Sequence, residues 1–258
     1  ELALMRRAAK ISAFAHRRLM QRCRPGMMEY ALESEFRCAC ASRGARELAY
    51  PTIVGGGANA CVLHYVENQS PLADGDLVLI DAGCELGGYA SDITRTFPVN
   101  GRFTPPQREL YQLVLAAQLA AIAATRPGVR WNAPHEAAVR VLTKGLVRLG
   151  ILEGKVGKLV KDEAYKPYYV HRTGHWLGMD VHDVGSYKLD GDWRPLEPGM
   201  VVTVEPGLYM PDAESVPERY RRIGIRIEDD VLVTETGHEV LTQGAPKDPD
   251  EIELLMAS

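Results

Sequence analysis

The sequence lacks any cysteine pattern that could cross-link a fold or hold a structural metal. Its 258 residues contain five cysteines, an odd number, and no two of them form a CxxC pair. Disulfide frameworks and zinc knuckles both need paired cysteines. We therefore expect neither, and the cysteine usage indicates a reducing, cytoplasmic location. All five lie in the first third of the chain: Cys23, Cys38, Cys40, Cys61 and Cys84.

Long apolar runs and an excess of positive charge are also missing. The longest apolar stretch, residues 113–124, is interrupted by Gln118 and is well short of the ~20 residues that span a bilayer. The 30 Lys and Arg residues are outnumbered by 34 Asp and Glu residues, a net charge of −4, whereas nucleic-acid binders usually carry a basic footprint. We therefore expect no membrane partner and no nucleic-acid partner.

What remains is typical of a globular α/β domain. The composition, 46% hydrophobic and 25% charged, excludes a disordered or collagen-like chain. Apolar periodicity predicts helices over residues 1–23 and 27–43. Thr104 is the expected N-cap of a third helix that runs to about Thr125. Short β-rich runs are expected between these helices: Tyr50 to Val54, Cys61 to Tyr65, Leu77 to Asp81 and Tyr89 to Phe97.

Two segments of the chain resemble each other. Residues 74–83 align without gaps on residues 198–207, and each reads as a Gly turn, a buried strand, a carboxylate and a Gly. Chance similarity between two ordinary turn-and-strand units is the alternative explanation. A duplication would divide the chain into pseudo-twofold halves of about 1–125 and 126–258. It would also bring together four carboxylates, two from each half: Asp81, Asp92, Glu205 and Glu228.

Such a group of carboxylates needs a positive partner. Burying them unpaired would cost several kcal/mol each, and an oxygen-rich site favours hard or borderline divalent ions such as Mn²⁺. Residues 169–183 add His171, His175 and His182, three of only seven histidines in the chain. One of them could complete the site. Taken singly, each aspartate could instead be a turn residue and each histidine a satisfied core residue.

Five residues, each in its own motif, resemble the metal ligands of the pita-bread metallopeptidases. The likeness runs essentially end to end and is greatest to the bacterial Xaa-Pro aminopeptidase (aminopeptidase P) branch. It implies a duplicated α/β (α+β) fold in which helices cover curved antiparallel sheets. The motifs are Ile80-Asp81-Ala82-Gly83, Ser91-Asp92-Ile93-Thr94, Gly174-His175-Trp176-Leu177-Gly178, Val204-Glu205-Pro206-Gly207 and Arg226-Ile227-Glu228-Asp229.

The resemblance implies a site for two divalent metal ions, most often Mn²⁺, with Co²⁺, Zn²⁺ or Fe²⁺ as alternatives. By match, Asp81 would chelate the first ion, and His175 and Glu205 would hold the second. Asp92 and Glu228 would bridge both. A hydroxide shared between two such ions attacks the Xaa-Pro amide of peptide substrates that carry proline at the second position.

Further roles follow from the same match. Glu205 would also take the proton from the shared water, and His171 would hydrogen-bond near the scissile carbonyl or its oxyanion. His64 and His182 would line the proline-side pocket. Arg226 and Tyr209 would support the site. Arg226 would act through His64 or through the carboxylates.

Related activities stay open at this stage. Methionine aminopeptidases lack the 226–229 pattern, but Xaa-Pro dipeptidase (prolidase) shares both the ligands and Arg226. A catalytically silent pita-bread binding module would usually have lost ligands that are intact here. The family usually carries a further N-terminal domain that residues 1–258 lack. We therefore expect a catalytic domain whose full-length parent is a homo-oligomer and is more active than this chain alone.

Overall fold

Six α-helices and two 3₁₀ helices are present in the computed structural model, which describes all residues 1–258. The α-helices are α1 (Leu2–Arg22), α2 (Glu29–Ala41), α3 (Pro105–Ala124), α4 (Ala133–Arg148), α5 (Val156–Lys161) and α6 (Pro249–Met256). The 3₁₀ helices are η1 (Gly57–Cys61) and η2 (Glu218–Tyr220). The helices expected over 1–23, 27–43 and from Thr104 to about Thr125 are confirmed as α1, α2 and α3. None of the helices combines the length and apolarity needed to cross a membrane.

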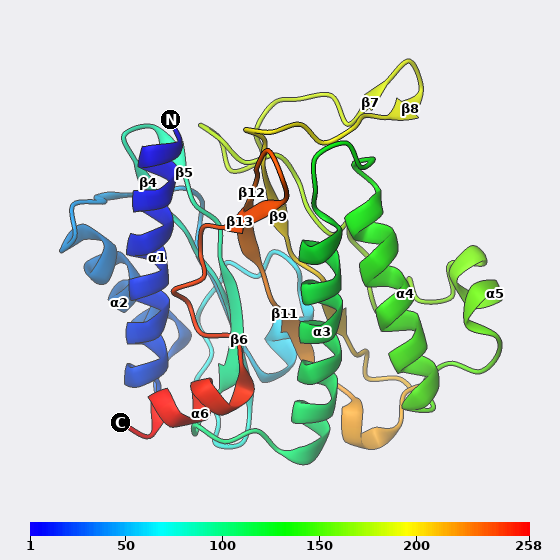
Figure 1. Cartoon of the computed structure of the whole chain (residues 1–258). Coiled ribbons are helices and arrows are strands. Elements are labelled where there is room, and N and C mark those ends of the chain that lie inside the picture. Colours follow the sequence, from blue (N-terminus) through cyan, green and yellow to red (C-terminus); the bar gives the residue numbers. More distant parts are fainter.

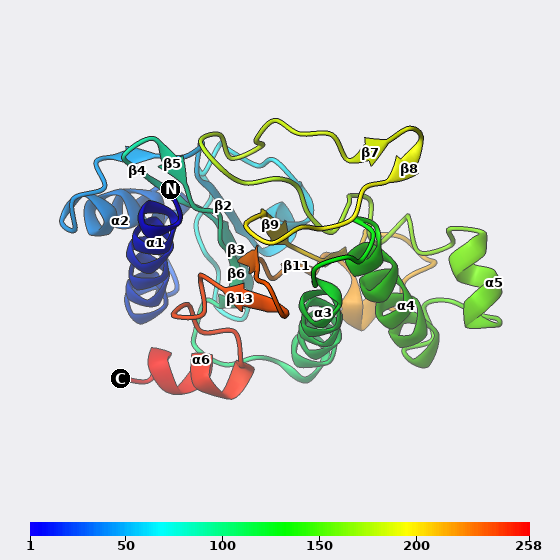
Figure 2. The same cartoon turned by 45° about the horizontal axis from the view of Figure 1, so that its top comes forward.

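Two three-stranded antiparallel sheets occupy the centre of the molecule. One has the order β2 (Ile53–Gly56), β3 (Leu77–Asp81), β6 (Thr94–Pro98), and the other the order β13 (His238–Val240), β12 (Asp229–Val233), β9 (Val201–Val204). Figures 1 and 2 show helices α1, α3, α4 and α6 along one side of these strands. This arrangement confirms the predicted α/β architecture of antiparallel sheets covered by helices.

Smaller antiparallel pairings surround the central sheets. They are β1 (Glu47–Leu48) with β4 (Cys84–Leu86) and β5 (Tyr89–Ala90), β10 (Gly207–Tyr209) with β11 (Gly224–Arg226), and β7 (Lys188–Leu189) with β8 (Asp192–Trp193). The β7–β8 hairpin lies on the side of the strands opposite helices α1 and α6 (Figure 2).

The register of the central sheets places the ends of paired strands side by side. Asp81, the last residue of β3, pairs with Thr94 at the start of β6. Val204, the last residue of β9, pairs with Asp229 at the start of β12. The carboxylates that follow or precede these positions are therefore close in space although far apart in sequence.

Three of the expected strands differ from the structure. The strand expected from Tyr50 to Val54 lies instead at Ile53–Gly56, as β2. Residues 61–65 form no strand, because η1 and an irregular segment occupy this stretch. Gly57 has a φ of +54°, and a Cβ there would lie 2.6 Å from Asp76 Oδ2, so the chain turns away from the sheet at this point. The run from Tyr89 to Phe97 is split into β5 and β6 by residues 91–93.

Close packing of α3 on α4 forms part of the main core. The buried face of α3 contains Leu110, Val114, Ala117 and Ala121 at helical spacing. Gly145 of α4 faces this helix, and a Cβ there would lie 2.2 Å from a methyl group of Leu113. Only glycine therefore permits this interhelical distance without displacing Leu113.

A buried ionic network ties the C-terminal segment to the strands that carry the predicted site. Arg95 Nη2 lies 2.7 Å from Asp229 Oδ1, and Lys247 Nζ lies 2.6 Å from Asp229 Oδ2. Burial alone would raise the pKa of Asp229, but these two cations hold it well below its usual range. Arg95 Nη1 also donates to the backbone carbonyl of Glu228. The network thus fixes the backbone beside one of the predicted metal ligands.

Candidate metal centre

Each predicted carboxylate ligand lies at a strand end or in a short gap between strands. Asp81 is the last residue of β3, and Glu205 directly follows β9. Asp92 lies between β5 and β6, and Glu228 lies between β11 and β12. The backbone leaves the sheet at these positions, so the side chains can point away from the ladder toward a common centre.

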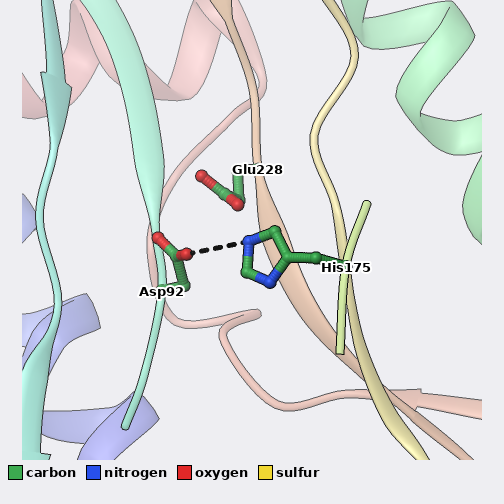
Figure 3. A group of neighbouring side chains, drawn as sticks. All are labelled: Asp92, His175 and Glu228. Carbon is green, nitrogen blue, oxygen red and sulfur yellow. Dashed lines mark ion pairs between the residues drawn. The ribbon is translucent and has the colours of Figure 1, made fainter. Parts of the chain in front are cut away.

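Three of the predicted ligands converge from different segments. The ligand atoms of Asp92, His175 and Glu228 all lie within 4.8 Å of one another. Figure 3 shows these three side chains pointing toward one another. Asp92 Oδ2 is 3.4 Å from His175 Nε2, and Glu205 Oε1 is 3.7 Å from the same nitrogen. These separations leave room for an ion between the donor atoms.

The fifth predicted ligand joins the cluster through a tyrosine that the sequence analysis missed. The Tyr50 hydroxyl lies 2.7 Å from Asp81 Oδ1 and 2.5 Å from Asp92 Oδ1. Burial, followed by the neighbouring carboxylates, raises the pKa of Tyr50 well above its ordinary value. Tyr50 therefore remains a protonated donor between two carboxylates. All five predicted ligands belong to one contiguous group.

His175 turns its Nε2 toward the carboxylates. Its Nδ1 lies 2.9 Å from the carbonyl oxygen of Trp176 and so carries the hydrogen that it donates. The other nitrogen, Nε2, faces Asp92 and Glu205, and a metal ion bound there would take the place of its proton. Burial opposes a charged imidazole, but the hydrogen bond to Asp92 and the charge of Glu205 outweigh it and raise the pKa of His175 to about 9.

The cluster carries surplus negative charge. Burial, reinforced by the other carboxylates, raises the pKa of Glu228 well above its ordinary value. Burial likewise raises the pKa of Glu205 to about 7. Divalent cations placed among these groups would remove the repulsion, and four carboxylates with one imidazole form a donor set for hard or borderline ions. The residues therefore fit the implied metals.

Arg226 is the guanidinium closest to the cluster. Its side chain is 4% exposed, and its Nη2 donates to Asp81 Oδ2 over 2.6 Å. Its Nη1 donates to the Tyr209 hydroxyl over 2.9 Å, and its Nε to Thr94 Oγ1 over 3.1 Å. Of the two partners expected for Arg226, the structure places it against the carboxylates, and no hydrogen bond to His64 occurs.

His171 completes a chain of hydrogen bonds that starts at Arg226. The Tyr209 hydroxyl accepts from Arg226 and lies 2.8 Å from His171 Nε2, to which it donates. His171 Nδ1 is 2.8 Å from the Arg172 carbonyl and 3.7 Å from Glu205 Oε2. Burial, then the charge of Arg226, lowers the pKa of His171 to about 3. His171 is therefore a neutral imidazole beside the carboxylate cluster.

The other two predicted histidines line the cavity above the cluster. The ring of His182 lies 4.4 Å from that of His175 in an edge-to-face arrangement. Burial, followed by the charge of His175, lowers the pKa of His182. His64 lies on the irregular segment after η1 and is exposed to the cavity. Both are thus placed to meet a ligand in the cavity.

The cavity has a volume of about 810 Å³, and the carboxylate cluster forms part of its wall. Its apolar lining includes residues that the sequence analysis did not single out, because nothing in their local pattern distinguishes them from core residues. These are Ile53, Leu63, Val66, Trp131, Tyr187 and Trp193. Trp131 and Tyr187 pack together at 4.8 Å between ring centroids. The cavity is therefore polar where the metal ligands lie and apolar around them.

Comparisons with known proteins agree with this geometry. A model of the metallopeptidase family M24 matches residues 3–235. The Xaa-Pro aminopeptidase of Escherichia coli (strain K12) is 56% identical over 259 residues, which cover 100% of this chain and 58% of that protein. The structure of Pseudomonas aeruginosa aminopeptidase PepP matches with a TM-score of 0.99 and 59% identity, over 100% of this chain and 58% of that chain.

A zinc-substituted structure of Escherichia coli aminopeptidase P in complex with product also matches. Its TM-score is 0.97 and its identity 56%, over 100% of this chain and 58% of that chain. The present chain thus spans less than two thirds of the length of these relatives. The likeness confirms the expected pita-bread fold.

Proposed function

This chain belongs to metallopeptidase family M24, and from that membership we propose that it is a dinuclear-metal aminopeptidase that releases the N-terminal residue from peptides with proline at the second position. One observation carries the proposal: Asp92, His175 and Glu228 direct their ligand atoms to one point in the wall of a cavity of about 810 Å³. The relatives named Xaa-Pro aminopeptidase support this activity over that of a prolidase.

We assign the metal ligands as the sequence predicts them. Asp81 would chelate one ion, His175 and Glu205 the other, and Asp92 and Glu228 would bridge the two. Two divalent ions held there would supply a water of lowered pKa and polarise the scissile carbonyl. Arg226 neutralises the outer oxygen of Asp81 and leaves its other oxygen to Tyr50 and the metal.

The remaining polar residues would handle the proton and the substrate. Glu205 would accept the proton of the attacking water and return it to the departing proline nitrogen. His171 Nδ1 lies 3.7 Å from Glu205 Oε2 and donates to the Arg172 carbonyl, while its Nε2 accepts from Tyr209. To donate to a substrate oxygen, His171 would have to carry its hydrogen on Nε2 and give up the bond from Tyr209. We propose that the substrate brings about this change, and that His171 and the Tyr209 hydroxyl then stabilise the developing oxyanion.

Proline selection would come from the cavity wall. The Xaa-Pro amide nitrogen has no hydrogen to donate, so a protein cannot select it through an acceptor and must hold the ring itself. Apolar side chains such as Leu63 and Val66 line the cavity beside His64, and His182 stands over His175. We propose that His64 and His182 orient the proline ring.

Mn²⁺ is the proposed metal, because the carboxylate-rich donor set suits it. All five cysteines are free, which supports the proposed cytoplasmic location. A division into halves of about 1–125 and 126–258 is supported by the similar positions of Asp81 at the end of β3 and Glu205 directly after β9.

Reconstitution with one metal at a time tests the function. Protein freed of metal by a chelator would be loaded with Mn²⁺, Co²⁺, Zn²⁺ or Fe²⁺ and offered Xaa-Pro-Yaa tripeptides and Xaa-Pro dipeptides. We expect Mn²⁺ to restore cleavage of the tripeptides. Cleavage of the dipeptides alone would show that the protein is a prolidase and not an aminopeptidase. Failure to bind any of these metals, with no cleavage, would favour a silent binding module.

A further inference from the structure

A buried carboxylate outside the metal centre organises the segment that carries His64. Glu29 is the first residue of α2 and is fully buried. We propose that Glu29 is a positioning residue, which holds residues 56–70 against the cavity and thereby places His64 for substrate. This inference rests on the proposed function for the role of His64, but the structural part can be tested without activity.

Four hydrogen bonds converge on the Glu29 carboxylate, and all of them come from residues 56–70. Oε1 accepts from the backbone N–H of Gly56 over 2.8 Å and from Asn59 Nδ2 over 3.0 Å. Oε2 accepts from the Tyr65 hydroxyl and from the backbone N–H of Ser70, each over 2.8 Å. One side chain thus joins the beginning, the middle and the end of the segment.

A second carboxylate of the same helix supports the end of the segment. Glu33, one turn after Glu29, accepts from Asn68 Nδ2 over 2.9 Å. Asn68 also donates to the carbonyl of Thr52 and accepts from the N–H of Val54, each over 2.9 Å. The end of the segment is therefore tied both to α2 and to the strand β2 region beneath it.

The segment depends on these side chains because its backbone is irregular. Residues 62–70 form neither helix nor strand, so no ladder fixes the position of His64. Leu63, His64 and Val66 nevertheless all line the cavity. Tyr65, which lies between them, points the other way and reaches Glu29. The hydrogen bond from Tyr65 to Glu29 therefore determines where His64 and Val66 lie in the cavity wall.

A carboxylate is the group this position requires. All four partners present hydrogens, and an ionised carboxylate accepts at both oxygens. The N-terminus of α2 further stabilises the negative charge. A glutamine would turn an NH₂ group toward N–H donors at one of the two positions. Gly56 permits the approach, because a Cβ there would lie 2.6 Å from the Leu72 side chain and 3.4 Å from Glu29 Oε1.

The first experiment compares Glu29→Gln with Glu253→Gln by hydrogen–deuterium exchange. Glu253 also accepts from a backbone N–H, that of Phe103 over 2.9 Å, but its partners lie outside residues 56–70. We expect exchange of the Gly56 and Ser70 amides to rise about tenfold or more in Glu29→Gln only. Exchange at residues 56–70 equal to wild type would overturn the proposal, whatever the activity of the protein.

The second experiment is a double-mutant cycle with His64→Ala on an Xaa-Pro-Yaa peptide. Glu29→Gln should lower kcat/KM about tenfold, mainly through KM, with unchanged bound metal, because residues 56–70 contain no proposed ligand. In the His64→Ala background this loss should largely vanish. A loss of the same size in both backgrounds would refute positioning through His64. If the wild-type protein cleaves no Xaa-Pro peptide, the proposed function is wrong. The hydrogen–deuterium exchange result then still tests whether Glu29 holds residues 56–70 in place.

A milder pair of variants covers the case in which Glu29→Gln does not fold. Tyr65→Phe removes one hydrogen bond to Glu29, and Tyr220→Phe removes the matching bond from Tyr220 to Glu109, outside the cavity. We expect a several-fold rise in KM and faster exchange at residues 56–70 for Tyr65→Phe alone. Equal behaviour of the two variants would contradict the role of this anchor.

Discussion

The guanidinium of Arg226 and the carboxylate of Asp81 form a buried ion pair of 2.6 Å between residues 145 positions apart in the chain. Arg226 is the last residue of β11 and Asp81 the last residue of β3. Burial raises the pKa of Asp81, and the charge of Arg226 opposes that rise. The pair therefore offsets part of the rise in the pKa of this predicted ligand and joins the two regions that supply the carboxylates.

Replacing Arg226 by Gln should destabilise the metal-free protein by about 3 kcal/mol or more, because it leaves Asp81 buried without its cation. Bound divalent metal should reduce this loss, since the metal then neutralises Asp81. Chemical unfolding with and without Mn²⁺ measures both values. Arg6→Gln is the control, because Arg6 forms an equally short but exposed pair with Glu239. Equal losses for the two variants would contradict this account of the buried pair.

The variants Asp92→Asn and Glu205→Gln should each abolish turnover of Xaa-Pro peptides. Asp92 contributes a bridging oxygen in the proposed site, so its amide should also lower the metal content per chain after dialysis, measured by elemental analysis. Glu205→Gln removes the proposed proton acceptor. A wild-type rate for Glu205→Gln would exclude Glu205 from proton transfer, and full metal content with normal turnover in Asp92→Asn would exclude bridging.

The variant His171→Ala should lower kcat by about 10²–10³-fold, the usual effect of removing an oxyanion donor. Tyr209→Phe should show a smaller loss, because it removes the hydroxyl that links His171 to Arg226 while leaving the imidazole in place. Steady-state kinetics with one Xaa-Pro-Yaa substrate separates the two. If KM alone changes in His171→Ala, the residue binds substrate without stabilising the transition state.

His16 should make the protein less stable in acid. This histidine of α1 is fully buried, its Nε2 donates to the Ala82 carbonyl over 3.0 Å, and its Nδ1 has no partner. Burial lowers the pKa of His16 from 6.5 to about 4. Between pH 6.5 and pH 4, His16 therefore binds a proton in the unfolded chain but not in the folded protein. The free energy of unfolding falls over this range by about 3 kcal/mol in total.

Urea unfolding of wild type and His16→Gln across this pH range measures the effect. Gln keeps a donor for the Ala82 carbonyl but does not titrate, so the stability of the variant should fall less steeply between pH 6.5 and pH 4. Parallel pH profiles would mean that His16 is not the group responsible.

The carboxylate cluster could be predicted from sequence because its signals are local. The run Leu77–Asp81 forms β3 with the predicted bounds, since a continuous apolar run after a Gly turn has few alternatives to a buried strand. The same pattern recurs before Glu205. Once two strands end in carboxylates and two more carboxylates follow, antiparallel pairing brings them together.

The supporting residues could not be predicted because their partners are distant in sequence. Tyr50 is 42 positions from Asp92, and nothing near it indicates that its hydroxyl lies between two carboxylates. The expected strand from Cys61 to Tyr65 was wrong for the same reason. Val62, Leu63 and Tyr65 are residues that favour strands, but no neighbouring strand pairs with this segment. The Tyr65 hydroxyl instead donates to Glu29, which lies more than 30 positions earlier in the chain.

The distribution of the carboxylates over two distant stretches has a consequence for the protein during its synthesis. A ribosome delivers Asp81 and Asp92 early, but Glu205 and Glu228 only after more than a hundred further residues. A nascent chain or a product of premature termination before residue 228 thus holds at most three of the four oxygen donors. Incomplete molecules therefore cannot assemble the full set of proposed ligands, and the proposed chemistry becomes available only to chains that have been translated past that point.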